Sequence, residues 1–277
     1  GAFDSLAPTR SVAIECTKDM LNDGKQLNGN SNLKSGDLFS EMEENFDPYE
    51  KYKNIHELTL SEKLELEKKS LGYYLSGHPV LAIENKIKKI RSKKVNQLNN
   101  DVKKASLVCL INSVRQIKDR KGKPLTFINF DDGTGTMDGI VAGDVLENCH
   151  SFLKEGEILN LKGAIEVDDY RTNDLGSLMF RMRVKEVSQL DTELNKRVNE
   201  VLINIVDSEA ISLEEFSKLL DTVDKRFWES GDCRLTVKVR SDKSEAIIDI
   251  GDNFKFNPSL ENLFHLEDIF GKNILEI

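Results

Sequence analysis

Several residue patterns are missing from this sequence, and each absence narrows what the chain can be. No two of the four cysteines form a C-x-x-C pair, and the four histidines are scattered singly. This cysteine usage argues against a zinc site and indicates a reducing compartment, so we expect a cytoplasmic location. No apolar run approaches the roughly 18 residues that a membrane helix needs, and we expect no membrane partner.

The N-terminal sequence "GAFDSLAPTR" shows no signal-peptide character. Its first residue is Gly1 rather than Met. We therefore expect the chain to begin after processing or inside a longer protein.

Signatures of enzymatic chemistry are missing as well. The sequence contains no P-loop, no dinucleotide fingerprint and no G-x-S-x-G elbow. Ser76 and His78 are two residues apart in "LSGHP", and neither a second His nor a Cys lies nearby to complete a metal site. The acidic pair Asp131–Asp132 falls in a predicted turn, where Asp bonds its own backbone. We expect neither a catalytic nor a metal site, and we interpret "SGHP" as a joint between helices.

The net charge of −9 is unevenly distributed. Residues 86–104 carry eight basic side chains and one acid, a sum of +7, so the remainder of the chain sums to −16. A local basic stripe on an acidic protein fits contact with a phosphate backbone. On charge alone, a solvated helix face is an equally good interpretation.

The first hundred residues are expected to be helical, with one interruption. Residues 1–20 predict a short apolar helix, and residues 22–36, rich in Asn, Gly and Ser, predict a flexible linker. Leu38 and Phe39 follow in an acidic segment, as a docking motif for a partner's groove or as a pair that folds back. A second helix opens with the capping-box spacing of Thr59 and Glu62. We expect Gly77 to end it in a left-handed conformation.

Pro79 is expected to open a further helix, with Ile83, Ile87 and Ile90 on its apolar side. From about residue 105 the hydrophobic period changes to two, which predicts strands at 105–118, 125–131, 136–142, 155–168 and 178–188. A short helix is expected at 143–154. This order is that of an OB-fold, a five-stranded Greek-key barrel.

The C-terminal residues predict a small α+β unit. A helical pattern covers 191–220, most clearly in "SLEEFSKLLDTVDKRFW" at 212–228. Strand-like runs at 234–241 and 245–251 precede a helix at 257–271. The fold class is therefore α+β multidomain, with a helical N-terminal segment, a five-stranded OB-fold barrel and a small C-terminal α+β domain.

OB-folds commonly hold single strands across strands 2 and 3, between the 1–2 and 4–5 loops. Cations and an aromatic platform are present in these places. Phe127 and Phe130 are three apart and face opposite ways, so only one of them can stack on a base. The candidate nucleic-acid residues are Arg115, Lys118, Arg120, Lys121, Lys123, Phe127, Tyr170, Arg171, Arg181 and Arg183.

Three motifs in order carry a family resemblance: "GAFD" at 1–4, "LGYYLSGHP" at 71–79 and "FDDGTG" at 130–135. With them the chain resembles the C-terminal part of the bacterial replicative DNA polymerase III alpha subunit, along essentially its whole length. The motif at 71–79 is the most specific of the three, since other OB-folds share the "DDGTG" turn.

The resemblance implies a domain plan. Residues 1–50 would close the fingers and helix-hairpin-helix region and carry a linker with a clamp-binding motif. Residues 51–100 would be a helical connector, 101–190 the OB-fold, and 191–277 the domain that binds the clamp-loader subunit tau. The implied clamp motif is Ser35, Gly36, Asp37, Leu38 and Phe39, with Ser35 where the family usually has Gln.

The implied function is tethering: the chain would hold the polymerase to the sliding clamp, single-stranded template and tau. The family often places an aromatic near Ala142, which this sequence lacks. The palm carboxylates and their Mg²⁺ would lie outside this chain, so the resemblance implies no catalysis and no cofactor here. The alternatives are a stand-alone OB-fold module for single strands or tRNA, and a module that binds only protein. The salt dependence of oligonucleotide binding separates these last two.

Overall fold

The computed structural model describes residues 7–29, 49–52, 55, 57–90, 92–118, 122–168, 179–206, 231–241, 244–249, 255–270 and 275–277. The chain divides into two compact units, Gly1–Gly77 and His78–Ile277. No helix in these ranges is long and apolar enough to cross a membrane. The predicted clamp motif at 35–39 lies outside the described residues.

The first unit is helical, with boundaries that differ from the sequence prediction. Helix α1 spans Arg10–Gly29, so it continues through the first part of the segment predicted as a flexible linker. The short 3-10 helix η1 covers Glu50–Tyr52, and α2 covers Leu60–Leu71. The capping box of Thr59 and Glu62 is confirmed. The prediction that Gly77 ends this helix is wrong, because Gly72 holds the left-handed cap at φ +82°.

The loop after α2 is held by one carboxylate. Glu67 is buried and accepts hydrogen bonds from the backbone N–H of Leu75 at 2.7 Å and of Ser76 at 2.8 Å. It also accepts one from the Ser76 hydroxyl. These bonds, the hydroxyl's first, hold the pKa of Glu67 at about 2. Ser76 is thus a structural residue, in agreement with the interpretation of "SGHP" as a joint.

The second unit begins with residues 78–100 of the expected 51–100 helical segment, which we call the connector, and they are less helical than predicted. Helix α3 covers only Pro79–Ala82, with His78 as its N-cap, and the 3-10 helix η2 covers Val95–Gln97. Turns occupy residues 83–89. Ile83, Ile87 and Ile90 are nevertheless buried, as the apolar spacing predicted.

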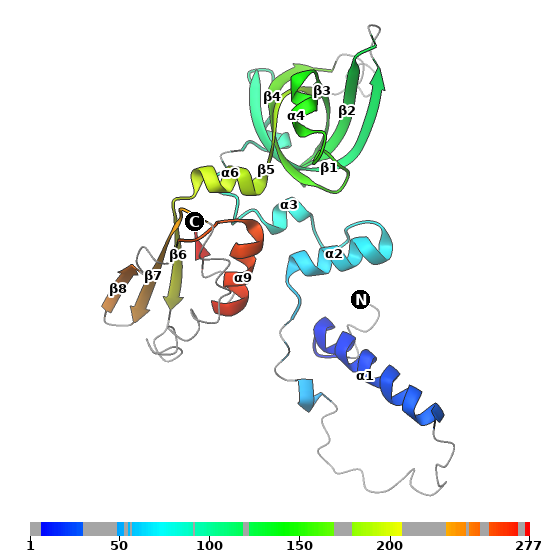
Figure 1. Cartoon of the computed structure of the whole chain (residues 1–277), viewed down its shortest axis with the longest axis vertical. Helices are drawn as coiled ribbons and strands as arrows, with labels where there is room; N and C mark the ends of the chain where they lie inside the picture. Colours follow the sequence, from blue (N-terminus) through cyan, green and yellow to red (C-terminus); the bar gives the residue numbers. More distant parts are fainter. Residues whose placement is uncertain are drawn as a thin grey trace, which may run out of the picture. The chain divides into compact units, whose positions relative to one another are not determined.

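The predicted OB-fold is confirmed. Strands β1 Lys104–Lys118, β2 Pro124–Asp131, β3 Thr136–Ala142, β4 Ile158–Val167 and β5 Phe180–Gln189 close a barrel in the order β1-β2-β3-β5-β4 (Figure 1). Helix α4, Asp144–Cys149, joins β3 to β4. Alternate residues of each strand fill the interior, among them Phe130, Leu161 and Met182, all 0% exposed. Residues between them project outward, and they form the candidate site.

The C-terminal part holds a second sheet. Helix α6, Leu190–Arg197, leads into β6 Glu200–Val206, β7 Arg234–Ser241, β8 Ser244–Asp249 and β9 Leu275–Glu276, ordered β8-β7-β6-β9. The continuous helical pattern expected over 191–220 is wrong for 200–206, because the apolar run "VLINIV" forms the central strand β6. The helix predicted at 212–228 lies outside the described residues. Helix α9 spans Leu260–Phe270.

Candidate nucleic-acid interface

Four outward-facing residues form one row across strands β1, β2, β3 and β5. Arg115 on β1 lies opposite Phe127 on β2. Phe127 lies opposite Ile140 on β3, and Ile140 lies beside Arg183 on β5. Paired residues on neighbouring strands project from the same face of a sheet. We name Arg115, Phe127, Ile140 and Arg183 the front row.

The structure separates the two candidate aromatics. Phe127 is 38% exposed, whereas Phe130 is 0% exposed in the barrel core. Phe127 is thus the aromatic of β2 that is placed to stack on a base. It lies between the guanidinium-bearing Arg115 and the apolar Ile140. An exposed ring beside cations is the arrangement that sequence-independent single-strand binding uses.

A second outward row carries polar side chains. Asn112 donates a hydrogen bond to Asn129 at 3.1 Å, and Asn129 donates one to Asp138 at 2.7 Å. On the neighbouring strands, Arg181 Nη2 lies 3.5 Å from Glu166 Oε2, and Arg183 Nε lies 3.2 Å from Glu166 Oε1. The two predicted arginines of β5 therefore share one carboxylate, which reduces the positive charge they present to a phosphate.

The remaining predicted residues belong to the two loops. Lys118 ends β1, and Lys123 immediately precedes β2; both are exposed. They lie at the same end of the β1–β2 hairpin, because Lys118 pairs with Pro124. The other four predicted residues lie outside the described part of the chain: Arg120, Lys121, Tyr170 and Arg171. The structure thus brings Arg115, Phe127, Arg181 and Arg183 together on one face.

The connector is hydrogen-bonded to the "DDGTG" turn at residues 131–135. Asp132 is buried; its side chain accepts hydrogen bonds from the backbone N–H of Thr134 at 2.9 Å and of Val95 at 2.8 Å. Asp131 accepts one from the Gly133 N–H at 2.6 Å. The role of these acids as turn residues is confirmed. Because Asp132 points into the connector, it does not oppose a phosphate on the front row.

His78 connects two of the three motifs that carried the family resemblance, "LGYYLSGHP" and "FDDGTG". Its Nδ1 accepts a hydrogen bond from the Val80 N–H at 3.3 Å, and its Nε2 lies 3.2 Å from Oδ1 of Asp131. Burial lowers the pKa of His78, against the opposing effect of Asp131 and Asp132. The side chain is thus a structural element of the connector.

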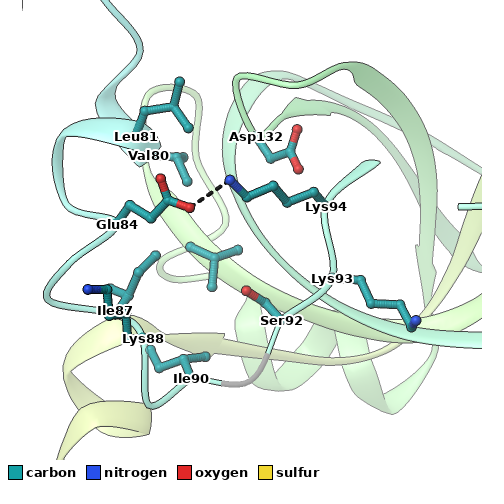
Figure 2. Close-up of a pocket in the computed structure, with 11 residues that line it drawn as sticks. Val80, Leu81, Glu84, Ile87, Lys88, Ile90, Ser92, Lys93, Lys94 and Asp132 are labelled. Carbon is teal, nitrogen blue, oxygen red and sulfur yellow. Dashed lines mark ion pairs between the residues drawn. The ribbon is translucent and has the colours of Figure 1, made fainter. Parts of the chain in front are cut away.

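A small pocket of about 170 Å³ lies between the connector and the barrel. Figure 2 shows the Lys94 ammonium reaching Glu84, and the two groups are 2.6 Å apart. Lys86 also forms an ion pair with Glu267, and its ammonium lies 4.3 Å from the centre of the Phe264 ring. Part of the positive charge of residues 86–104 is thus neutralised by carboxylates. The pocket is lined by Val80, Leu81, Glu84, Ile87, Lys88, Ile90, Ser92, Lys93, Lys94, Val108 and Asp132.

Sequence reasoning missed two residues of the site. Ile140 and Glu166 were not among the candidates, although both alternate outward in their strands. The strict alternation in "TMDGIVA" assigns Ile140 to the outer face. Glu166 has no comparable signal, since its pairing with two arginines depends on the register between β4 and β5. Among the described residues, no group of three or more His, Cys, Asp or Glu could hold a metal ion.

Comparison with known proteins agrees with this geometry. Residues 107–190 match a family model described as an OB-fold nucleic acid binding domain. The DNA polymerase III subunit alpha of Pseudomonas fluorescens is 24% identical over 99% of this chain and 24% of its own length. That of Haemophilus influenzae is 25% identical over 100% of this chain and 23% of its own. That of Neisseria meningitidis serogroup A is 31% identical over 63% of this chain and 15% of its own.

The resemblance drawn from the motifs is therefore confirmed along the whole chain. The chain spans about a quarter of the length of the first two relatives. Among solved structures, the SSB domain of a Synechococcus protein is 9% identical, covering 33% of this chain and 100% of that chain, at a TM-score of 0.27. A similarity this low carries no functional argument.

Proposed function

Because the chain is similar over its length to DNA polymerase III alpha subunits, we propose that it is the part of such a polymerase that holds single-stranded DNA. The observation that carries the proposal is the front row, an exposed phenylalanine flanked by Arg115 on one side and by Ile140 and Arg183 on the other. Bases stack on the ring, and the guanidinium groups pair with the backbone phosphates. The interaction tolerates any sequence, as a template contact must.

The role is non-catalytic. A polymerase contact of this kind acts by raising the effective concentration of template near an active site elsewhere. The proposal therefore requires no metal or cofactor in this chain, and it places the polymerase chemistry in the remainder of the protein, in the bacterial cytoplasm.

Two protein partners complete the proposal, and both follow from the family resemblance. Residues 35–39, "SGDLF", would dock into the sliding clamp through Leu38 and Phe39. Residues 191–277 would hold the clamp-loader subunit tau. Several weak contacts on one chain combine into strong avidity without any single tight site.

Binding of the chain to labelled oligothymidylate tests the template contact. Replacing both front-row arginines, Arg115→Gln with Arg183→Gln, should weaken binding and lower the salt slope by about 0.7 for each lost phosphate contact. A matched control neutralises two exposed lysines elsewhere, Lys154→Gln with Lys255→Gln. Equal losses in the two double variants would contradict a specific front-row site.

The clamp contact has a separate test. The chain is titrated against a bacterial sliding clamp, beside the variant Leu38→Ala with Phe39→Ala. Loss of binding in the variant supports the proposed motif. Unchanged binding would mean that the clamp contacts another segment, and it would leave the front row unaffected.

A further inference from the structure

The front row continues around the barrel beyond the strands where OB-folds commonly hold nucleic acid. Arg183 on β5 lies opposite Ala164 on β4, and Ala164 lies opposite Lys104 at the start of β1. Since neighbouring strands are about 4.8 Å apart, the four steps from Phe127 to Lys104 cover roughly 19 Å of surface. The path therefore runs from the aromatic ring across β3 and β5 onto a different face.

On that face lies a groove of about 640 Å³, which we call the β1–β4–β5 groove. Its floor contains Ala105, Ser106, Gly163 and Ala164. A Cβ added at Gly163 would lie 2.4 Å from the carbonyl oxygen of Arg183 and 2.8 Å from Cγ of the core residue Met182, so glycine lets β4 pass close to β5 here. The pairing of β4 with β5 shifts register between Lys162 and Gly163. The groove thus lies where the β4–β5 pairing is irregular.

Three lysines and one acid surround this floor: Lys104, Lys162, Lys185 and Glu186. Lys162 already forms two ion pairs, because its ammonium lies 2.8 Å from the carboxylate of Glu186 and 3.2 Å from that of Glu193. Lys104 and Lys185 are exposed, and the described part of the chain offers them no ion-pair partner. The groove therefore presents two ammonium groups that are available to an anion.

We propose that the β1–β4–β5 groove is a second phosphate-binding site for the same DNA strand that crosses the front row. This inference rests on the proposed function and extends it. The occupant is a sugar–phosphate backbone, because the floor is too bare for base stacking while Lys104 and Lys185 complement phosphate charge. Arg183 connects the two sites, since it belongs to the front row and lies opposite Ala164 in the groove.

The test compares oligothymidylates of about 4 and about 16 nucleotides, the limits of site size for OB-folds. In the variant Lys104→Gln with Lys185→Gln, binding of the long strand should lose about 1.4 from its salt slope. Between 50 and 200 mM salt, the unmodified chain should then lose about sevenfold more affinity than the variant. Binding of the short strand, which the front row alone holds, should stay unchanged.

The control variant Lys154→Gln with Lys255→Gln removes the same charge away from the groove and should leave both strands unaffected. If the groove variant matches this control on the long strand, the second site is wrong while the front row stands. Equal weakening of short and long strands would also overturn it, because the lysines would then act through the general field. Failure of the unmodified chain to bind either strand would overturn the proposed function and the inference together.

Discussion

Glu166 restrains Arg183 at the front row, with 3.2 Å between the guanidinium Nε and the carboxylate. The same carboxylate lies 3.5 Å from Arg181. In the proposed interface, a phosphate that binds either arginine must compete with this acid, so a strand would be held less tightly than the cations alone would allow. Weak binding would suit the proposed template contact, past which a template must move.

Replacing Glu166 by Gln should therefore tighten single-strand binding. The change removes one negative charge from the face and leaves both guanidinium groups available to phosphate. We expect a several-fold lower Kd at low salt, measured by fluorescence anisotropy. Glu147→Gln on α4 removes the same charge from another place and should change the Kd little. Equal effects of the two variants would show that only net charge matters.

Replacing Phe127 should weaken single-strand binding, whereas replacing Phe130 should lower the stability of the barrel. Phe127→Ala should abolish most single-strand binding, with base stacking worth about 1–3 kcal/mol, while the barrel stays folded. Phe130→Ala should cost about 3–5 kcal/mol of unfolding free energy, because its ring is 0% exposed in the core. Chemical denaturation and oligonucleotide titration of both variants check the pair. A large stability loss in Phe127→Ala would place its ring in the core instead.

Gly133 should be far less replaceable than Gly122. Both have positive φ, +82° and +77°, so alanine meets the left-handed penalty of roughly 1–2 kcal/mol at either site. At Gly133 the added Cβ would also lie 2.9 Å from Leu81 and 3.0 Å from His78, whereas at Gly122 it meets nothing within 4 Å. Gly133→Ala should therefore destabilise by about 1–3 kcal/mol more, measured by denaturant titration. Equal losses would mean that the connector does not pack on this turn.

Glu67 should make the joint after α2 sensitive to acid. Its pKa of about 2 lies below the ordinary 4.5, so its ionised form stabilises the folded loop at all pH values above 4.5. That contribution falls as pH drops from 4.5 towards 2. The Ser76 amide chemical shift should titrate with a midpoint near 2. Glu67→Gln should remove the transition, Glu65→Gln should preserve it, and a midpoint near 4.5 would contradict the account.

The barrel was predictable because its determinants are local. Alternating apolar residues, Gly-containing turns and loop lengths follow one another along the chain, and this alternation alone places Arg115, Phe127 and Arg183 on strands. The inward orientation of Phe130 was not predictable, because the two aromatics are equivalent until the strand's register with its neighbours is known. The pairing of Glu166 with both arginines depends on the same long-range register.

In the connector and the C-terminal sheet, the spacing of apolar residues does not predict the secondary structure. Ile83, Ile87 and Ile90 have helical spacing, yet residues 83–89 form turns whose backbone hydrogen bonds are mostly of the three-residue kind, such as that from the Lys86 N–H to the Ile83 carbonyl at 2.9 Å. The three side chains are buried all the same. The apolar run "VLINIV" follows a helical pattern that begins at residue 191, so the sequence predicts a helix where the structure has strand β6. Tertiary contacts outweigh helix propensity at both places.

The most direct test of the central claim is the affinity of the unmodified chain for oligothymidylate across a range of salt concentrations, measured beside Phe127→Ala. The account predicts binding that weakens linearly with log salt concentration and is largely lost in Phe127→Ala. Absence of binding at low salt, or binding that neither salt nor the loss of Phe127 affects, would contradict it.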